Sequence, residues 1–298
     1  MIATLPMYDW PEIREDTEAW WSGIARHLGS TVPLSHPADY MASWERPDLL
    51  FSQTCGYPFT HALKGKVTYL ATPHYEADGC DGPSYCSMIF AREKRPLEAF
   101  RGSTAAVNTP DSMSGMLALK LVFAAHAEQG QFFARAILSG GHRKSLAAVR
   151  EGRADVCAID AVCVALAKRY APQDLEGLVE VARSPSVPAL PYITNRGDAE
   201  TLRHALRAAC DDPSLARTRE RLLIEDVQPI TEDRYSLITD YEKERERSGG
   251  LPISPRAWGS LPSPRCLICE RHARCAVAGR SSAWASRWCC WPSPPASG

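Results

Sequence analysis

The feature that most constrains the fold of this chain is the alternation of short apolar runs with stretches of helical spacing. Runs of strand length lie at residues 2–8, 48–52, 67–72, 87–92, 104–108, 134–138, 155–159, 178–182 and 192–194. Helical spacing is found from residue 11 onward and over residues 96–100, 112–129, 145–151, 161–170, 198–209 and 213–225. Because strands that alternate with helices form sheets with crossover helices, the sequence predicts an α/β fold.

Two such α/β units follow one another, joined by strand-like connections near residues 90–96 and 182–191. This arrangement predicts two lobes that face each other across a cleft, with lobe 1 made of residues 1–94 and 188–250 and lobe 2 of residues 95–187. Residues 251–298 differ, because Arg, Ser, Pro, Trp and Cys dominate there and no strand or helix period survives. We expect this tail to be disordered or to be an aberrant, out-of-frame extension.

Composition argues against several classes of partner. The 298 residues carry 34 basic and 35 acidic side chains, so a formal net charge of −1 gives no reason to expect nucleic acid or an acidic membrane. No apolar run approaches the roughly 20 residues needed to cross a bilayer. Met1 is not followed by the basic segment that starts a signal peptide. We expect a cytoplasmic protein as the sequence is written, or a periplasmic or membrane-associated one if translation starts upstream.

The eleven cysteines divide into six scattered over the first 250 residues and five within the last 33. Cys157 and Cys163 have apolar neighbours and are expected to be buried free thiols. Without an export signal, a disulfide framework is not expected. The run from Cys266 to Cys275 holds three cysteines and a histidine, but two residues between successive ligands are too few for most closed zinc sites. We therefore predict neither a metal nor a cofactor.

Polar turns follow several of the apolar runs, and the most informative turn extends from Asn108 to Gly115 (Asn-Thr-Pro-Asp-Ser-Met-Ser-Gly). A helical stretch begins there, so the first backbone N–H groups of that helix have no partner. Together with the helix dipole and the hydroxyls of Ser112 and Ser114, these N–H groups favour an anion. Gly115 lets a ligand approach the backbone. The alternative is an ordinary serine N-cap without a ligand.

A second turn, over residues 139–145, and the strand end at Asp160 supply two further candidates. His142 can donate a hydrogen bond to an anion or a hydroxyl, and a solvated loop histidine is the alternative. Asp160 either caps the following helix or, as a group that only accepts hydrogen bonds, distinguishes a protonated oxyanion from a fully ionised one. Arg143 and Lys144 are expected to be surface charges.

Candidates in lobe 1 also lie at strand ends. Gln53 and Thr54 end an apolar run and precede an expected helix, which again presents free N–H groups. A tyrosine supplies an apolar wall with a polar tip. Four tyrosines lie at strand ends or in loops around the same cleft, with core packing as the alternative for each: Tyr8, Tyr57, Tyr75 and Tyr85.

Three short motifs follow one another in the second unit: Ser112-Met-Ser-Gly115, then Ser139-Gly-Gly-His142 about 25 residues later, then Ala158-Ile-Asp-Ala-Val162. In combination they resemble the phosphate, phosphite and phosphonate substrate-binding proteins of ABC transporters, which have the type 2 periplasmic binding protein fold. The segment Tyr85-Cys-Ser-Met-Ile89 is similar to a Tyr-x-Ser-x-Ile stretch of that family. The resemblance covers roughly residues 1–245.

The resemblance implies a two-lobed clamp without catalysis, a small oxyanion as ligand, an ABC transporter permease as partner, and a monomer. It carries ligand-binding roles over to Ser112, Ser114, Gly115, His142, Asp160 and Tyr85. Tyr8, Gln53 and Thr54 are added from their strand-end positions alone. Met113 stands where the family has a hydroxyl, and this loss of a donor alters the preferred ligand.

Two other functions stay open. Relatives with this fold include enzymes of thiamine-pyrimidine and menaquinone synthesis, so the chain can be a cytosolic enzyme in which His142 or Cys55 acts. Cys55 would then have a lowered thiol pKa at a helix N-terminus. The other alternative is a cytosolic sensor that couples lobe closure to a partner. The hydroxyls at strand ends favour binding, and the missing leader favours these two alternatives.

Overall fold

The apolar runs form two mixed six-stranded sheets in the computed structural model, which describes residues 1–247 and 258–259. The first sheet has the order β14-β4-β13-β3-β1-β2, with bounds Ile224–Gln228, Thr68–Tyr75, Tyr192–Thr194, Leu49–Gln53, Ile2–Thr4 and Leu34–Ser35. The second has the order β11-β7-β10-β8-β9-β15, with bounds Val179–Arg183, Ser87–Ala91, Val156–Asp160, Thr104–Val107, Arg135–Leu138 and Trp258–Gly259. The α/β fold is confirmed.

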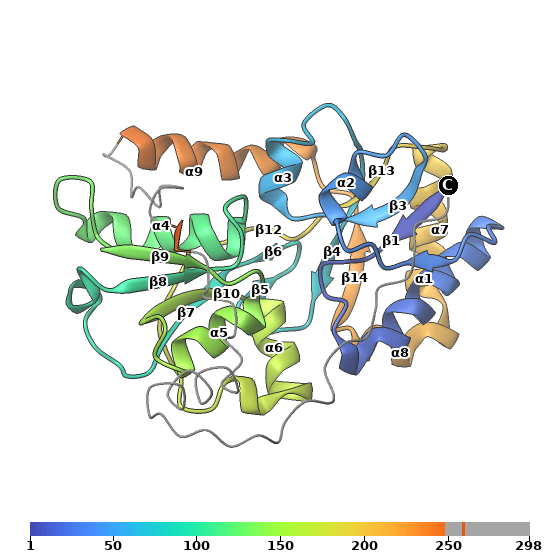
Figure 1. Ribbon diagram of the computed structural model, residues 1–298. Coiled ribbons are helices and arrows are strands. Elements are labelled where there is room, and N and C mark those ends of the chain that lie inside the picture. Colours follow the sequence, from blue (N-terminus) through green and yellow to red (C-terminus); the bar gives the residue numbers. More distant parts are fainter. Residues whose placement is uncertain (248–257, 260–298) are drawn as a thin grey trace, which may run out of the picture. The chain divides into compact units, whose positions relative to one another are not determined.

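Helices flank both sheets (Figure 1). Those of the first are α1 (Arg14–Leu28), α2 (Tyr40–Trp44), α3 (Gly56–Thr60), α7 (Ala199–Asp211) and α8 (Ala216–Arg221). In the second, α4 (Ala118–Phe123) lies on one side and α5 (His142–Arg150) and α6 (Ala161–Tyr170) on the other. The helix α9 (Ser236–Arg247) contacts both α3 and α4. Short turns are 3-10 helical at Pro11–Ile13, Leu97–Phe100, Ala124–His126, Pro172–Asp174, Pro213–Leu215 and Glu232–Tyr235, and π-helical at Met113–Leu117.

The chain passes between the two sheets through short strands of a third sheet, β12-β6-β5 (Val187–Pro188, Ser84–Tyr85 and Cys80–Asp81). The first passage lies at residues 76–86, between β4 and β7, and the return lies at residues 184–191. The expected connection near residues 90–96 is therefore wrong, because β7 pairs along its length with β10 and β11. An apolar run identifies a strand but not its neighbours, so the lobe boundary predicted at residue 94 is too late in the chain.

Parallel pairing gathers three strand ends at one edge of the second sheet. β8 is parallel to β9 and to β10, so the carboxyl ends at Val107, Leu138 and Asp160 lie together. In the first sheet β1 is parallel to β3, and the chain leaves these strands toward Tyr8 and Cys55. Ligands in open α/β sheets bind beyond such carboxyl ends. The pairing therefore places all the predicted polar turns at edges where a ligand can bind.

Large aromatic side chains fill the core of the first sheet. Phe51 stacks between Trp21 and Tyr192, at centroid distances of 5.3 and 5.1 Å. Cys157 on β10 and Cys163 on α6 are buried free thiols, as predicted. Among the described residues, no helix is long and apolar enough to cross a membrane. The interpretation of residues 251–298, including the possible zinc ligands, falls outside the described residues apart from the two of β15.

Candidate functional site

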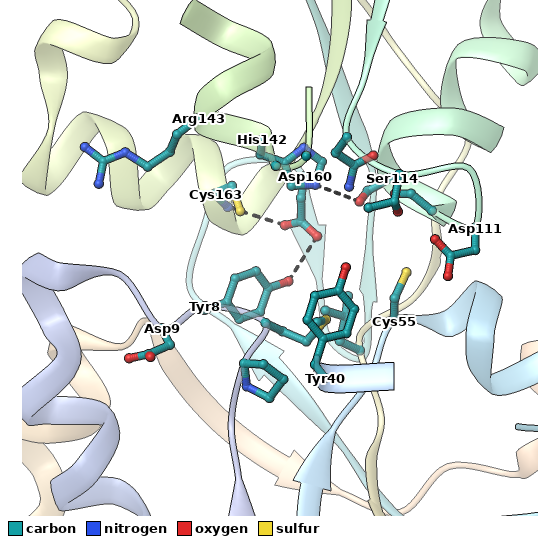
Figure 2. A pocket seen from close by; sticks show the side chains of 18 of the residues that line it. Tyr8, Asp9, Tyr40, Cys55, Asp111, Ser114, His142, Arg143, Asp160 and Cys163 are labelled. Carbon is teal, nitrogen blue, oxygen red and sulfur yellow. Dashed lines mark hydrogen bonds between the residues drawn. The ribbon is translucent and has the colours of Figure 1, made fainter. Parts of the chain in front are cut away.

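A cavity of about 300 Å³ lies where the polar turns meet (Figure 2). On one side it is lined by the turns after β8, β9 and β10. On the other it is lined by the segment after β1, by α2 and by residues around the start of α3. Five of the predicted site residues line it: Tyr8, Ser112, Ser114, His142 and Asp160. Ser112, Ser114, His142 and Asp160 converge from three strand ends because β8 pairs in parallel with β9 and β10, whereas Tyr8 follows β1 on the other side.

The turn after β8 brings two serines into the cavity. Ser112 is extended and caps the helix, because its Oγ accepts a hydrogen bond from the Gly115 N–H at 2.9 Å. Ser114 lies in the π-helical first turn, and its Oγ is 3.0 Å from His142 Nε2. Both serines are nearly buried, with exposed fractions of 3% and 4%. The capping alternative is thus correct for Ser112, while Ser114 offers its hydroxyl beside the imidazole.

Gly115 does not line the cavity, which corrects its expected role at the ligand. Its N–H is taken by Ser112 Oγ. A Cβ at this position would lie 1.8 Å from Asn108 Oδ1, so another side chain occupies the space that a ligand was expected to use. The glycine is required because the Asn108 amide packs directly on its Cα.

Asn108 is a cavity residue that the sequence analysis missed. It follows β8 directly, and its backbone carbonyl accepts a hydrogen bond from the Gly140 N–H at 2.9 Å, which ties the first turn to the second. Its Oδ1 is buried without a hydrogen-bond partner among the described residues. The signal that could have found it is its position, since it is the first residue beyond a strand end.

His142 begins α5 and contacts Ser114 across the cavity, as Figure 2 shows. Burial lowers the pKa of its imidazole to about 4, so the ring is neutral at pH 7. A hydrogen bond with the Ala158 backbone opposes part of this lowering. A neutral ring can donate a single N–H to a ligand but adds no positive charge.

Asp160 ends β10 and joins the two sides of the cavity. Its Oδ1 accepts from the N–H groups of Val162 at 2.8 Å and Cys163 at 3.4 Å, which caps α6, and its Oδ2 accepts from the Tyr8 hydroxyl at 3.0 Å. The side chain is 2% exposed, and burial raises its pKa to about 6. Asp160 is therefore both a helix cap and a cavity carboxylate, and most molecules carry it ionised at pH 7.5.

The remaining predicted residues do not line the cavity. Gln53 donates from Nε2 to the Tyr75 hydroxyl at 2.9 Å and to the Leu190 carbonyl at 3.0 Å. The Thr54 N–H donates to the Pro191 carbonyl at 3.1 Å, so the N–H groups expected to be free here are used by the returning chain. Tyr85 is buried, with an exposed fraction of 1%, and its hydroxyl lies beside Ser114 behind the cavity lining.

Arg143 is not the free surface charge expected. Its Nε donates to Asp174 at 2.6 Å, its Nη1 donates to both carboxylate oxygens of Glu12 at 3.0 Å, and its guanidinium lies 4.6 Å from the ring centroid of Trp10. These contacts link α5, beside the second sheet, to the segment after β1. Lys144 is exposed and lines the cavity without an ion pair to any described residue.

The first-sheet side of the cavity includes Tyr40 and Cys55. Tyr40 lies on α2, in a stretch where the sequence showed no pattern, so its place in the cavity was not predicted. Burial raises the pKa of the Cys55 thiol to about 11, although a lowered value was expected, because desolvation outweighs the short helix α3 that follows. In residues 1–247 and 258–259 no group of three His, Cys, Asp or Glu side chains is arranged to hold a metal.

The comparisons with known proteins agree with this geometry. The family described as "ABC transporter, phosphonate, periplasmic substrate-binding protein" matches residues 2–235, which are 234 of the 298 residues. No curated protein sequence matches the chain significantly.

Several solved structures share the fold, and three of them are described here. A binding protein component of an ABC phosphonate transporter from Pseudomonas aeruginosa is 17% identical, with 86% of this chain and 91% of that chain covered and a TM-score of 0.67. PhnD1 from Prochlorococcus marinus, in complex with methylphosphonate, is 13% identical, with 83% and 98% covered and a TM-score of 0.66. XAC2383 from Xanthomonas citri, bound to ATP, is 18% identical, with 83% and 97% covered and a TM-score of 0.61.

At these identities the structural likeness shows the fold alone, and it confirms the predicted two-lobed α/β fold of the type 2 periplasmic binding proteins. The family match extends over more than three quarters of the chain. The protein therefore belongs to the family of periplasmic substrate-binding proteins of phosphonate ABC transporters.

Proposed function

We propose that the protein binds a small oxyanion of the phosphonate, phosphite or phosphate type in the cavity and presents it to an ABC transporter permease without catalysing a reaction. Membership of the family supports a solute-binding role in such a transporter. The identity of the oxyanion and the absence of catalysis are the proposal.

The observation that carries the proposal is the convergence of neutral hydrogen-bonding groups from two strand ends, those of β8 and β9. The Ser114 hydroxyl and the His142 imidazole lie 3.0 Å apart in one cavity, and Asn108 and the Gly140–Gly141 backbone line the same cavity. Lys144 adds a positive charge that no described acidic residue neutralises. Preorganised donors in a partly water-excluded site suit a tetrahedral anion.

Asp160 gives the proposed site a preference among oxyanions. An ionised carboxylate accepts hydrogen bonds and repels a fully ionised anion. A phosphonate, phosphite or phosphate that keeps one proton can donate it to Asp160, whereas sulfate has no proton to donate at neutral pH. We therefore expect the site not to bind sulfate. Bound sulfate and the Asp160 carboxylate would be two negatively charged groups in contact without a shared proton.

The Ser114–His142 pair has the spacing of a nucleophile and its base, but its surroundings favour binding over catalysis. An imidazole with a pKa of about 4 is a weak base, and no described carboxylate accepts from its Nδ1 to orient the ring. The Cys55 thiol, with a pKa of about 11, is protonated at neutral pH. Neither His142 nor Cys55, the groups that the enzyme hypothesis needs, is activated for catalysis.

Isothermal titration calorimetry at pH 7.5 with phosphate, phosphite, methylphosphonate and sulfate tests the proposal. We expect binding of at least one phosphorus oxyanion and none of sulfate. Ser114→Ala and His142→Ala are each expected to weaken binding at least tenfold, since each removes a hydrogen-bonding group from the cavity. Ser103→Ala, before the amino end of β8, and His126→Ala are matched controls outside the cavity and should bind as the unaltered protein does.

The absence of catalysis is tested with the same ligands. Phosphorus-31 NMR of each ligand after prolonged incubation with the protein should show unchanged resonances. Appearance of a product from any ligand would contradict a purely binding role and favour the enzyme hypothesis.

Oligomeric state and location are part of the proposal and need separate measurements. We expect a monomer, which size-exclusion chromatography with light scattering measures. For the location we propose the cytoplasm, with the periplasm or the membrane as the alternatives. Cell fractionation with an antibody against residues 1–247 distinguishes these compartments.

A further inference from the structure

The cavity is larger than a bare oxyanion requires. Its volume of about 300 Å³ equals that of roughly ten water molecules at about 30 Å³ each. Phosphate, phosphite and methylphosphonate have five non-hydrogen atoms or fewer, so any of them leaves about half of the space unfilled. The size therefore indicates a ligand with a larger organic part.

The two sides of the cavity differ in chemistry. The second-sheet side carries the hydrogen-bonding groups of Ser112, Ser114 and His142. The first-sheet side is aromatic and apolar, and its lining residues include Met7, Tyr8, Trp10, Tyr40 and Trp44. Figure 2 shows the rings of Tyr8 and Tyr40 on the side opposite Ser114 and His142. An oxyanion bound by the polar side would direct its substituent toward these rings.

Tyr40 is held as a rigid, half-buried surface. Its ring packs on Trp44 at a centroid distance of 5.1 Å, and Trp44 is fully buried with its indole N–H bonded to Ser52 Oγ at 3.0 Å. Asp39 caps α2 through the Ala42 N–H at 2.9 Å and fixes the helix that carries Tyr40. A ring held in this way can stack against a ligand with little loss of side-chain entropy.

Carboxylates also lie near the aromatic side. Asp9 is paired with Arg14 at 3.1 Å and with His36 at 2.8 Å. Asp160 accepts a hydrogen bond from the Tyr8 hydroxyl. Asp111, from the turn after β8, lines the cavity near Tyr40, where burial and the charge of Asp111 both raise the pKa of the Tyr40 hydroxyl. The rings of this side therefore favour a flat substituent, whether it is neutral or cationic.

We propose that the ligand is an oxyanion carrying a planar ring, an aryl phosphonate or aryl phosphate, whose ring lies against Tyr40 while Ser114 and His142 hold the oxyanion. This inference rests on the proposed function and specifies the class of its ligand. Ring stacking and burial of apolar area supply the additional affinity.

Calorimetry of the full chain with methylphosphonate, phenylphosphonate, phenyl phosphate and 2-aminoethylphosphonate tests the inference. We expect phenylphosphonate to bind at least tenfold more tightly than methylphosphonate and than 2-aminoethylphosphonate. Phenyl phosphate distinguishes an ester ligand from a phosphonate, and tight binding of either phenyl compound supports the inference. Equal or weaker binding of both phenyl compounds would overturn it, as would a preference for 2-aminoethylphosphonate.

Variants of Tyr40 test the contact itself. Tyr40→Ala should lower the affinity for phenylphosphonate about tenfold more than the affinity for methylphosphonate, and Tyr40→Phe should keep the preference because the ring remains. Tyr241→Ala, on α9 and away from the cavity, is the matched control. If methylphosphonate binds and the phenyl compounds bind no better, only the ring proposal fails. If none of the four compounds binds, the proposed function fails as well.

Discussion

Replacing Asp160 by Asn is expected to stabilise the fold at neutral pH, because the substitution removes a buried charge and keeps the hydrogen bonds that cap α6. The bond from the Tyr8 hydroxyl is replaced by one that the Asn side-chain N–H donates to the Tyr8 oxygen. The amide oxygen of Asn can accept from the N–H groups of Val162 and Cys163, since Asn is as good an N-cap as Asp. The charge itself lies in a side chain that is only 2% exposed.

The magnitude follows from the pKa of the carboxyl. Burial raises it from 3.8 to about 6, and two pKa units correspond to about 3 kcal/mol of folding free energy. Because a raised pKa of an acid means that the folded state disfavours the charged form, the cost is absent below pH 3.8 and complete above about pH 6. Asp160→Asn should therefore raise the free energy of unfolding by about 3 kcal/mol at pH 7.5 and leave it unchanged at pH 3.5.

His142 has the opposite effect on the pH dependence of folding stability. The stability of the unaltered protein alone therefore does not isolate the contribution of Asp160. Its pKa is lowered from 6.5 to about 4, which stabilises the fold above pH 6.5 and loses that stabilisation as the pH falls through 4. The difference between the variant and the unaltered protein cancels the histidine contribution and isolates that of Asp160.

Urea unfolding followed by circular dichroism between pH 3.5 and 7.5 measures this difference. Asp198→Asn is the matched control, since Asp198 also caps a helix, α7, but is exposed and has a lowered pKa. The control should not become more stable as the pH rises. The difference in free energy of unfolding between Asp160→Asn and the unaltered protein should grow between pH 4 and pH 6. If it does not grow, or if the variant is less stable at pH 7.5, the assignment of a buried charge is refuted.

Three further experiments have defined outcomes. Asn108→Asp should lower the affinity for methylphosphonate at least tenfold, because a carboxylate replaces an amide beside the anion; calorimetry measures this, and unchanged affinity would exclude Asn108 from the ligand contacts. Arg143→Ala removes the bond to Asp174 and the bonds to Glu12, and those to Glu12 link the two sides of the cavity. It should weaken ligand binding about tenfold and increase the radius of gyration of the ligand-free protein, and identical small-angle scattering would contradict that linking role. Cys55 should react slowly with iodoacetamide at pH 7.5, since its thiol pKa is about 11, and mass spectrometry showing rapid labelling at this residue would contradict the raised pKa.

Local patterns in the sequence predicted much of the polar side of the cavity. Ser112, Ser114, His142 and Asp160 follow apolar runs directly, and chain connectivity alone puts such residues at strand ends. Gln53 and Thr54 satisfied the same rule and were wrong, because the returning residues Leu190 and Pro191 use their hydrogen-bonding groups. That partner lies more than 130 residues away in the chain, and no local pattern reports it.

The assignment of Gly115 shows a similar limit. A glycine beside two serines is typical of an anion site, but here the glycine makes room for Asn108 Oδ1. Tyr40 was missed because its stretch of chain has no regular spacing, although packing on Trp44 places it in the cavity. Both outcomes depend on which side chains meet in space.

The sequence by itself determined the α/β class, most strands and helices, and the turns that offer hydroxyl, imidazole and carboxylate groups, because periodicity and turn chemistry are local properties. Only the tertiary structure decided that β7 belongs to the second sheet, that an aromatic side faces the polar one, and how each group ionises. The physical reason is that strand pairing and desolvation arise from residues far apart in the chain. Burial is the largest cause that moves the pKa of His142 to about 4 and that of Asp160 to about 6, and both groups are buried by residues distant in the chain.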